Sequence, residues 1–298
     1  MIAWDKWIDR PEGRDPKRGR VTRRGLGALG LGAGYALAAQ PVSAQTAITT
    51  DMDGIETRKV TLNGFDGFAM PAFAARPTME GGPFPAVIVV NEIFGLHAYI
   101  QDICRRFAKA GYFALAPGYF ERAGDPSEAK DFAAVREIVA QAGQDQVLKD
   151  TDTAFRWLET EPSADADRVG ITGFCWGGNV VWMFTAREPK IKAGAAWYGR
   201  LAKPAQDESD RVYPIDVADQ MTGRVLGLYG GQDRGIPVSD VEAMRAALKA
   251  AGDETSEIIL YDDAQHGFHA DYRPSYDAAA AKDGWARLMA WFAERGVA

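Results

Sequence analysis

The chain has 298 residues, of which 47% are hydrophobic and 25% charged, with two cysteines and a formal net charge of −7. This profile is typical of a globular protein whose core is large enough to fold without disulfide or metal staples. The acidic balance argues against nucleic acid and anionic membranes as partners. Neither composition nor spacing indicates a coiled coil, an internal repeat or a low-complexity tail.

The first 44 residues differ in composition from the rest. Arg23 and Arg24 precede a weakly apolar Gly/Ala/Leu run, and Val42-Ser43-Ala44 follows it. A basic region, a short apolar region and a small-residue site in this order predict an export signal, cleaved near Ala44. The paired arginines favour the twin-arginine route and a periplasmic or secreted product. A retained, disordered N-terminus is the alternative. Without residues 1–44 the net charge becomes −11.

The same segment contains a Gly25-x-Gly27-x-x-Gly30 pattern. We interpret it as a chance match to the dinucleotide fingerprint, because no strand precedes it and no βαβ unit surrounds it. The apolar run of about 15 residues is short for a transmembrane helix. We therefore expect no stable membrane span after signal removal, and a single domain over residues 45–298.

Strand patterns and helix patterns alternate along that domain. Two short strands over 57–73 are joined at Asn63-Gly64, a hairpin signal. Continuous apolar runs then predict buried strands at 86–92, 112–117, 169–174, 193–199, 225–230 and 257–262. Helices are expected at about 97–110, 127–142, 145–160, 177–187, 238–251 and 275–295. This alternation predicts an α/β fold with a mostly parallel sheet and helices on both faces.

Polar residues follow several of the predicted strands. In parallel sheets the active site lies at the carboxyl ends of the strands. Cys175, Asp233 and His266 each follow a separate strand, in the order nucleophile, acid and base that characterises the α/β-hydrolase fold. The three residues in this order indicate an α/β-hydrolase far more specifically than any one of them does.

Cys175 lies in the stretch "GITGFCWGG", which has the Gly-x-nucleophile-x-Gly form of a tight strand-to-helix turn. The flanking glycines, Gly173 and Gly177, supply the space that such a turn needs. The sulfur would lie at the amino end of the following helix, where the dipole favours the thiolate. The backbone N–H groups of Trp176 and Ile93 are expected to form the oxyanion hole.

His266 is expected to act as general base, and Asp233 to orient its ring and stabilise the imidazolium. Asp262 and Asp263 are rivals for the acid, but they lie too near His266 in sequence to reach it comfortably. His97 and His269 are the only other histidines.

The second cysteine, Cys104, falls on the apolar stripe of the helix predicted at 97–110, so we expect it to be a packing residue and not a disulfide partner. No CxxC pair is present, and only His266 and His269 have a spacing typical of metal ligands. We therefore expect no metal and no cofactor.

The motifs "NEIFGL", "APGYFER", "GFCWGG", "GGQD" and "HGFH", in this order, resemble the dienelactone hydrolase family, a cysteine branch of the α/β hydrolases, over residues 57–296. The resemblance implies that Cys175, Asp233 and His266 form the catalytic triad. It also implies that Glu92 helps to generate the thiolate.

For substrate binding, the resemblance implies that Arg122 holds a carboxylate, and Tyr119 in the same motif is a further candidate. The family's second carboxylate-binding arginine corresponds to Ala270 here. Arg273 and Arg200 are the candidates to replace it.

The expected function is the opening of an enol lactone such as dienelactone through a thioester intermediate. A thiolate is both a strong nucleophile and a good leaving group, which suits activated esters. A broad carboxylesterase or thioesterase is the alternative within enzymes, and a thiol redox sensor on a hydrolase frame is the alternative outside them. The expected partner is a small lactone or ester carrying a carboxylate, and the expected state is a monomer.

Overall fold

A single eight-stranded sheet forms the centre of the computed structural model, which describes residues 48–221 and 224–298. Its strands are β1 (Ile55–Asn63), β2 (Ala69–Pro77), β3 (Phe84–Val90), β4 (Phe113–Pro117), β5 (Ala164–Phe174), β6 (Ala193–Trp197), β7 (Val225–Gly230) and β8 (Glu257–Tyr261). The predicted export signal lies outside the described residues.

The strand order is β1-β2-β4-β3-β5-β6-β7-β8. β1 pairs antiparallel with β2, and β2 pairs antiparallel with β4, whereas β4, β3, β5, β6, β7 and β8 are parallel to one another. The hairpin predicted at Asn63-Gly64 is therefore the antiparallel edge of a parallel sheet. The prediction of a mostly parallel sheet is confirmed.

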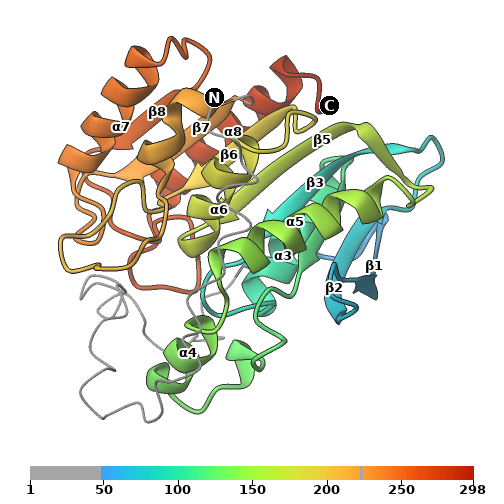
Figure 1. The fold of residues 1–298 in the computed structure, drawn as a ribbon. Helices are drawn as coiled ribbons and strands as arrows, with labels where there is room; N and C mark the ends of the chain where they lie inside the picture. Colours follow the sequence, from blue (N-terminus) through green and yellow to red (C-terminus); the bar gives the residue numbers. More distant parts are fainter. Residues whose placement is uncertain (1–47, 222–223) are drawn as a thin grey trace.

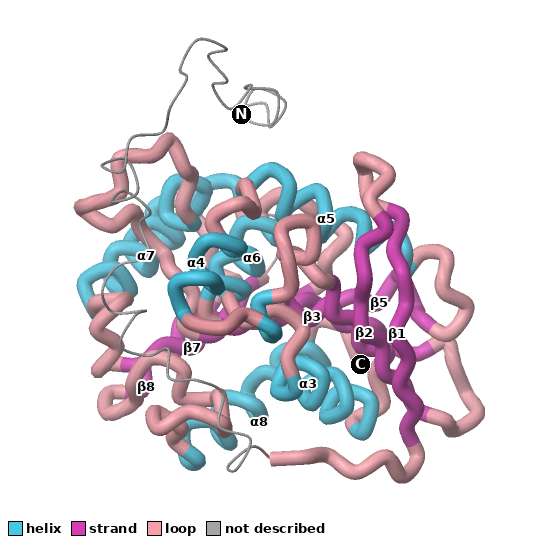
Figure 2. Tube along the Cα trace, turned by 90° about the horizontal axis from the view of Figure 1, so that it is seen from below, coloured by secondary structure: helices cyan, strands magenta, loops and turns pink. Residues whose placement is uncertain are grey.

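Helices cover both faces of this sheet (Figures 1 and 2). They are α3 (Ala98–Lys109), α4 (Phe132–Val139), α5 (Gln144–Leu158), α6 (Trp176–Thr185), α7 (Val238–Ala250) and α8 (Ala278–Glu294). α3 and α8 share one face, where Phe107 and Trp285 pack with ring centroids 4.8 Å apart. α5, α6 and α7 lie on the opposite face (Figure 2). No helix in the described ranges is long and apolar enough to cross a membrane.

The helix predicted at 127–142 is wrong in its first part. The chain forms a short 3-10 turn at Pro126–Glu128, and α4 begins only at Phe132. Asp131 is extended, with φ −160° and ψ 170°, and its carboxylate accepts the N–H of Ala134 at 2.8 Å. An aspartate in this position caps the helix that follows. Asp131 therefore marks the start of α4 and separates it from the 3-10 turn.

The central strands are buried over nearly their whole length. β4, β6 and β7 are buried at every residue, and β3 at every residue except Pro85. Side chains covered on both faces must be apolar on both, which explains why these strands read as continuous hydrophobic runs. The rigid centre of the sheet thereby places the strand ends that carry Glu92, Cys175 and Asp233.

Candidate active site

Cys175 occupies a strained turn between β5 and α6. Its φ of 56° and ψ of −114° lie where L residues are rarely found, and Tyr198 is the only other non-glycine residue with positive φ in the part of the chain that the structure describes. The Cys175 N–H is fixed by the carbonyl of Trp197 at 2.9 Å. Such strain persists only where the surroundings enforce it, and it is concentrated at functional sites.

The glycines around Cys175 permit this turn. A Cβ atom on Gly173 would lie 2.4 Å from the carbonyl oxygen of Gly177, and one on Gly177 would lie 2.5 Å from the carbonyl oxygen of Val90. Both contacts involve backbone, which cannot yield without moving β3 or α6. The close approach therefore brings the end of β3 against the first turn of α6.

The two amides expected to form the oxyanion hole lie at the start of α6 and in the loop that follows β3. Trp176 is the first residue of α6, so its N–H has no acceptor one turn earlier in the helix. Ile93 is 2% exposed in the loop that follows β3. The close packing of Gly177 on Val90 joins these two segments.

His266 and Asp233 are hydrogen-bonded at the other side of the site. Nδ1 of His266 lies 2.7 Å from Oδ2 of Asp233. The second carboxylate oxygen, Oδ1, accepts the N–H groups of Gly235 at 2.7 Å and Ile236 at 3.1 Å. Three bonds thus fix the carboxylate, and it in turn fixes the imidazole. Asp262 and Asp263, the rival acids, are exposed.

The charges around His266 favour its protonated form. Burial by itself lowers the pKa of the imidazole, but Asp233 and Cys175 outweigh burial and raise it to about 10. Cys175 acts here both through its charge and through a side-chain hydrogen bond to the ring. The structure therefore brings Cys175, His266 and Asp233 together.

Glu92 lies in a separate buried cluster next to the thiol. It is fully buried at the end of β3, and Oε1 accepts Nη2 of Arg273 at 2.9 Å while Oε2 accepts the hydroxyl of Tyr272 at 2.5 Å. Nε2 of His97 lies 3.4 Å from Oε2. In this structure the partners of the carboxylate are thus a cation and a phenol.

This cluster is held in its charged form. Burial raises the pKa of Glu92, but Arg273, His97 and Tyr272 together lower it further, to about 2. Burial lowers the pKa of Arg273, whereas Glu92 raises it to a value above the ordinary one, and Cys175 acts in the same direction. Arg273 is therefore a buried cation that interacts electrostatically with Cys175.

Solvent has little access to these groups. Cys175 is 1% exposed, and His266 and Arg273 are each 6% exposed. In such a dry site each charge interaction is stronger than it would be in water.

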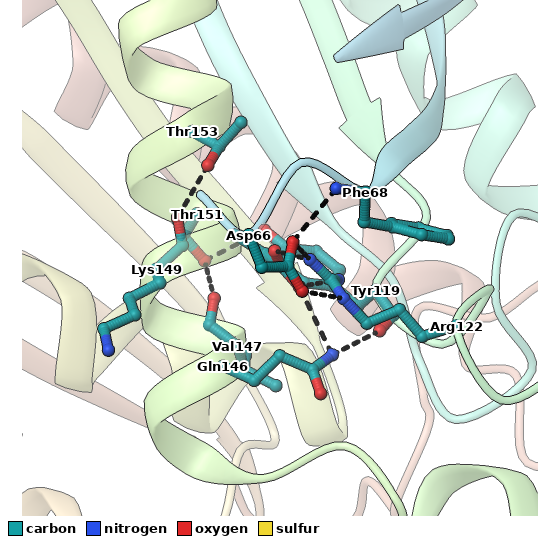
Figure 3. A network of polar contacts seen from close by, with 10 residues as sticks. Asp66, Phe68, Tyr119, Arg122, Gln146, Val147, Lys149, Thr151 and Thr153 are labelled. Atoms are coloured by element: carbon teal, nitrogen blue, oxygen red, sulfur yellow. Dashed lines mark hydrogen bonds and ion pairs between the residues drawn. The ribbon is translucent and has the colours of Figure 1, made fainter. Parts of the chain in front are cut away.

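Arg122, the expected carboxylate binder, has other partners (Figure 3). Its Nη1 and Nη2 donate to Asp150 on α5 at 2.6 and 3.0 Å, and its Nε and Nη2 donate to Asp66 at 3.2 and 2.9 Å. The guanidinium also stacks on the ring of Phe68 at 4.4 Å. These bonds join the β1–β2 turn to α5 and give Arg122 two carboxylate partners already, which does not support the expected role.

Two further candidates for substrate contact also have partners in the fold. The hydroxyl of Tyr119 accepts from Oγ1 of Thr151 at 3.1 Å, although its ring packs against Trp176. The carbonyl of Arg200 accepts the side-chain amide of Asn179 at 2.8 Å, and its charge acts on Asp240 of α7. The charge of Cys175, in contrast, raises the pKa of Arg273.

The remaining histidine and cysteine have structural surroundings. Burial, followed by the charge of Arg106, lowers the pKa of His269 to about 3, and its Nδ1 lies 2.6 Å from the hydroxyl of Tyr99. Cys104 is fully buried on α3, and burial raises the pKa of its thiol. Both cysteines are free. Among the described residues, no group of His, Cys, Asp and Glu could hold a metal ion.

The model of the dienelactone hydrolase family matches residues 70–296. The chain belongs to the dienelactone hydrolase family. It is therefore a hydrolase with the α/β-hydrolase fold, as its sequence motifs predict.

Relatives of this dienelactone hydrolase family member match between 74% and 93% of it. A protein of Methylorubrum extorquens named "Putative carboxymethylenebutenolidase" is 48% identical over 279 residues, which is 93% of this chain and 94% of the relative. A Bradyrhizobium protein named "Probable 2-oxo-3-(5-oxofuran-2-ylidene)propanoate lactonase" is 33% identical over 74% of this chain and 88% of its own length. The crystal structure of a "Putative Dienelactone Hydrolase" from Klebsiella pneumoniae, 44% identical, superposes with a TM-score of 0.77 over 81% of this chain and 100% of that one.

Sequence reasoning gave no role to three side chains of this dienelactone hydrolase site. Tyr272 and His97 contact Glu92, and the buried ring of Tyr198 packs against His266 with centroids 5.2 Å apart. Tyr272 directly precedes Arg273, and Tyr198 directly follows β6, so position relative to a strand end or a candidate residue was the only available signal. Nothing in the local sequence of His97 indicates a contact with Glu92.

Proposed function

We propose that the protein hydrolyses enol lactones that carry a carboxylate, with Cys175 as nucleophile, His266 as general base and Asp233 as the orienting acid. The observation that carries the proposal is the strained Cys175 turn beside an imidazole whose other nitrogen is fixed by Asp233 at 2.7 Å. Nucleophile, base and orienting group in this relation are the requirements of covalent acyl transfer.

In the first half of the reaction the thiolate attacks the lactone carbonyl, and the carbonyl electrons move onto its oxygen. The amides of Trp176 and Ile93 are the proposed donors to that oxyanion. Collapse of the intermediate breaks the ring C–O bond and leaves an acyl group on the sulfur, while the imidazolium of His266 gives its proton to the departing enolate and becomes neutral. In the second half, His266 takes a proton from water, which attacks the thioester and releases the acid and the thiolate.

Arg273 is the proposed binder of the substrate carboxylate. It is the buried cation that acts on Cys175, and it lies three residues after Ala270, which has no charge to offer. Glu92 competes for the same guanidinium at 2.9 Å. A substrate carboxylate that takes over this contact would release Glu92 from the guanidinium of Arg273.

The substrate class is supported by the chemistry that the relatives' names describe. A carboxymethylenebutenolide and a (5-oxofuran-2-ylidene)propanoate are both unsaturated five-membered lactones with an anionic arm. Both expel an enolate when the ring opens, which makes them activated esters suited to a thiolate.

The test is to measure kcat/KM on dienelactone and on a neutral aryl acetate, with Cys175→Ala as the blank. We expect a preference for dienelactone of more than tenfold, no turnover by Cys175→Ala, and a thioester on Cys175 by mass spectrometry of quenched wild-type enzyme. Turnover by Cys175→Ala at the wild-type rate would refute the nucleophile. Equal or reversed rates on the two substrates would leave a broad carboxylesterase or thioesterase in place of the lactonase.

We also propose that residues 1–44 direct export to the periplasm and that the mature protein is a monomer. The support is the Arg23-Arg24 pair before an apolar run and a small-residue site. Fractionation of cells that express the full chain, beside a variant with both arginines replaced by lysine, tests the export route. Retention of the wild-type protein in the cytoplasm would refute it. Light scattering of the mature protein tests the monomer.

A further inference from the structure

Tyr198 has a buried hydroxyl that no group of the fold uses. The side chain is 0% exposed, and its Oη has no hydrogen-bond partner among the described residues. Leaving a buried hydroxyl unpaired costs about 1–3 kcal/mol. Phenylalanine would fill the same space without this cost, so the hydroxyl needs an explanation outside the folded protein's own contacts.

The backbone of Tyr198 is held in a strained conformation. Its φ is 40°, and it is the first residue after β6. The next residue, Gly199, packs so tightly on the first turn of α6 that a Cβ atom on it would lie 2.2 Å from the carbonyl carbon of Gly178. The same contact that fixes the start of α6 therefore fixes the direction of Tyr198.

The phenol lies in the reaction site. Its ring meets His266 edge to face at 5.2 Å and Phe268 at 5.3 Å. Burial raises the pKa of Tyr198 well above its ordinary value, and the charges of Glu92 and Cys175 raise it further. The phenol thus keeps its proton at neutral pH and can act as a hydrogen-bond donor.

We propose that Tyr198 is a further catalytic residue, whose hydroxyl donates a hydrogen bond to the oxygen of the leaving group as the acyl C–O bond breaks. This inference rests on the proposed function. The bonding electrons of the C–O bond move to that oxygen, the carbon keeps its new bond to sulfur, and the protein proton acceptor remains His266. Tyr198 keeps its own proton, since it only shares it with the developing enolate or phenolate.

The edge-to-face contact with His266 explains why this donor would serve the leaving oxygen. The oxyanion of the carbonyl is assigned to the backbone amides of Trp176 and Ile93. The imidazolium is the group that delivers a proton to the departing oxygen in acyl transfer. A donor packed on that ring is placed to bind the same atom.

The experiment measures kcat/KM of Tyr198→Phe on phenyl acetate and on 4-nitrophenyl acetate, because kcat/KM reports the steps through acylation. A hydrogen bond to a developing charge predicts a loss of about 10–100-fold on phenyl acetate, whose leaving phenolate is the more basic. We expect a loss below threefold on 4-nitrophenyl acetate, whose phenolate needs little help. Thermal stability should be unchanged or higher, because an unpaired buried hydroxyl has been removed.

Tyr229→Phe is the matched control. Tyr229 is also buried, but its hydroxyl accepts Nε1 of Trp182 at 3.0 Å, so its loss should lower stability and leave both rates unchanged. Equal rates of wild type and Tyr198→Phe on both esters would overturn the proposal, as would an equal loss on both. If the wild type turns over no more dienelactone than Cys175→Ala, the proposed function falls and Tyr198 with it.

Discussion

Arg122 and Arg273 are both bound to carboxylates, but the two clusters differ in charge and depth. Arg122 lies between Asp150, whose side chain is buried, and Asp66, whose side chain is 42% exposed, so this cluster has one excess negative charge. The side chain of Arg273 is 4% exposed and pairs with the single carboxylate of Glu92, so this ion pair is neutral. Two anions around Arg122 repel a third one, whereas one anion on Arg273 can be replaced by a substrate.

The difference shows that a motif position does not by itself give an arginine its role. Arg122 is the residue that matches the family motif, yet its bonds join the β1–β2 turn to α5 (Figure 3). Arg273 matches no motif position, yet it lies beside Glu92 and acts on Cys175. We therefore expect mutations of Arg122 to change stability and mutations of Arg273 to change catalysis.

The largest effect is expected for Arg273→Met. Truncating one partner of a buried, hydrogen-bonded charge pair costs about 2–5 kcal/mol, so kcat/KM on dienelactone should fall about 1000-fold. On a neutral aryl acetate the loss should be about tenfold, because no substrate carboxylate is lost there. Arg273→Lys is the control that keeps the charge, and it should retain more activity on dienelactone than the Met variant. Equal losses on both substrates would contradict carboxylate binding.

Arg122→Met should act on stability. It leaves the buried carboxylate of Asp150 without its cation, which predicts a loss of about 3 kcal/mol in the free energy of unfolding. We expect kcat/KM on dienelactone to change less than threefold, measured below the unfolding transition. Asp150→Asn in the Arg122→Met background should restore part of the stability. A tenfold rise in KM with unchanged stability would return Arg122 to substrate binding.

Glu92→Gln should change stability in a pH-dependent way. The pKa of Glu92 is about 2 in the fold against an ordinary value of 4.5, so the carboxylate stabilises the fold fully above pH 4.5 and loses this effect as the pH falls toward 2. The variant should therefore be about 2 kcal/mol less stable than wild type at pH 7, with a difference that narrows below pH 4.5. Urea unfolding at pH 7, 4 and 3 measures it. A constant difference would show that Glu92 acts through packing alone.

The smallest effect is expected for Asp66→Asn. Its carboxylate is largely exposed, and exposed ion pairs contribute about 0.2–1 kcal/mol at most. The loss of stability should lie in this range and disappear in 1 M salt, where charges on the surface are screened. A loss as large as that of Arg122→Met would mean that Asp66, and not Asp150, is the main partner of the guanidinium.

The order of Cys175, Asp233 and His266 was predictable because parallel strands all end at one edge of the sheet. Each residue follows its own strand, so the alternation of strands and helices already brings the three near one another. The need for glycines around Cys175 was also predictable from the sequence, because a nucleophile turn has no room for Cβ atoms. The break before α4 was not predictable from apolar spacing, because only the cap at Asp131 reveals it.

The amino-acid sequence by itself determined the fold class, the nucleophile turn and the family, because these depend on local chain properties: hydrophobic period, small residues in a tight turn and the order of strand ends. The tertiary structure decided which partner each charged side chain has. Asp150 reaches Arg122 across 28 positions and Glu92 reaches Arg273 across 181, and no local pattern encodes such a pairing. The ion-pair partner of a long side chain depends on the distance between the charged groups and on their burial. Both quantities are set only when the chain has folded.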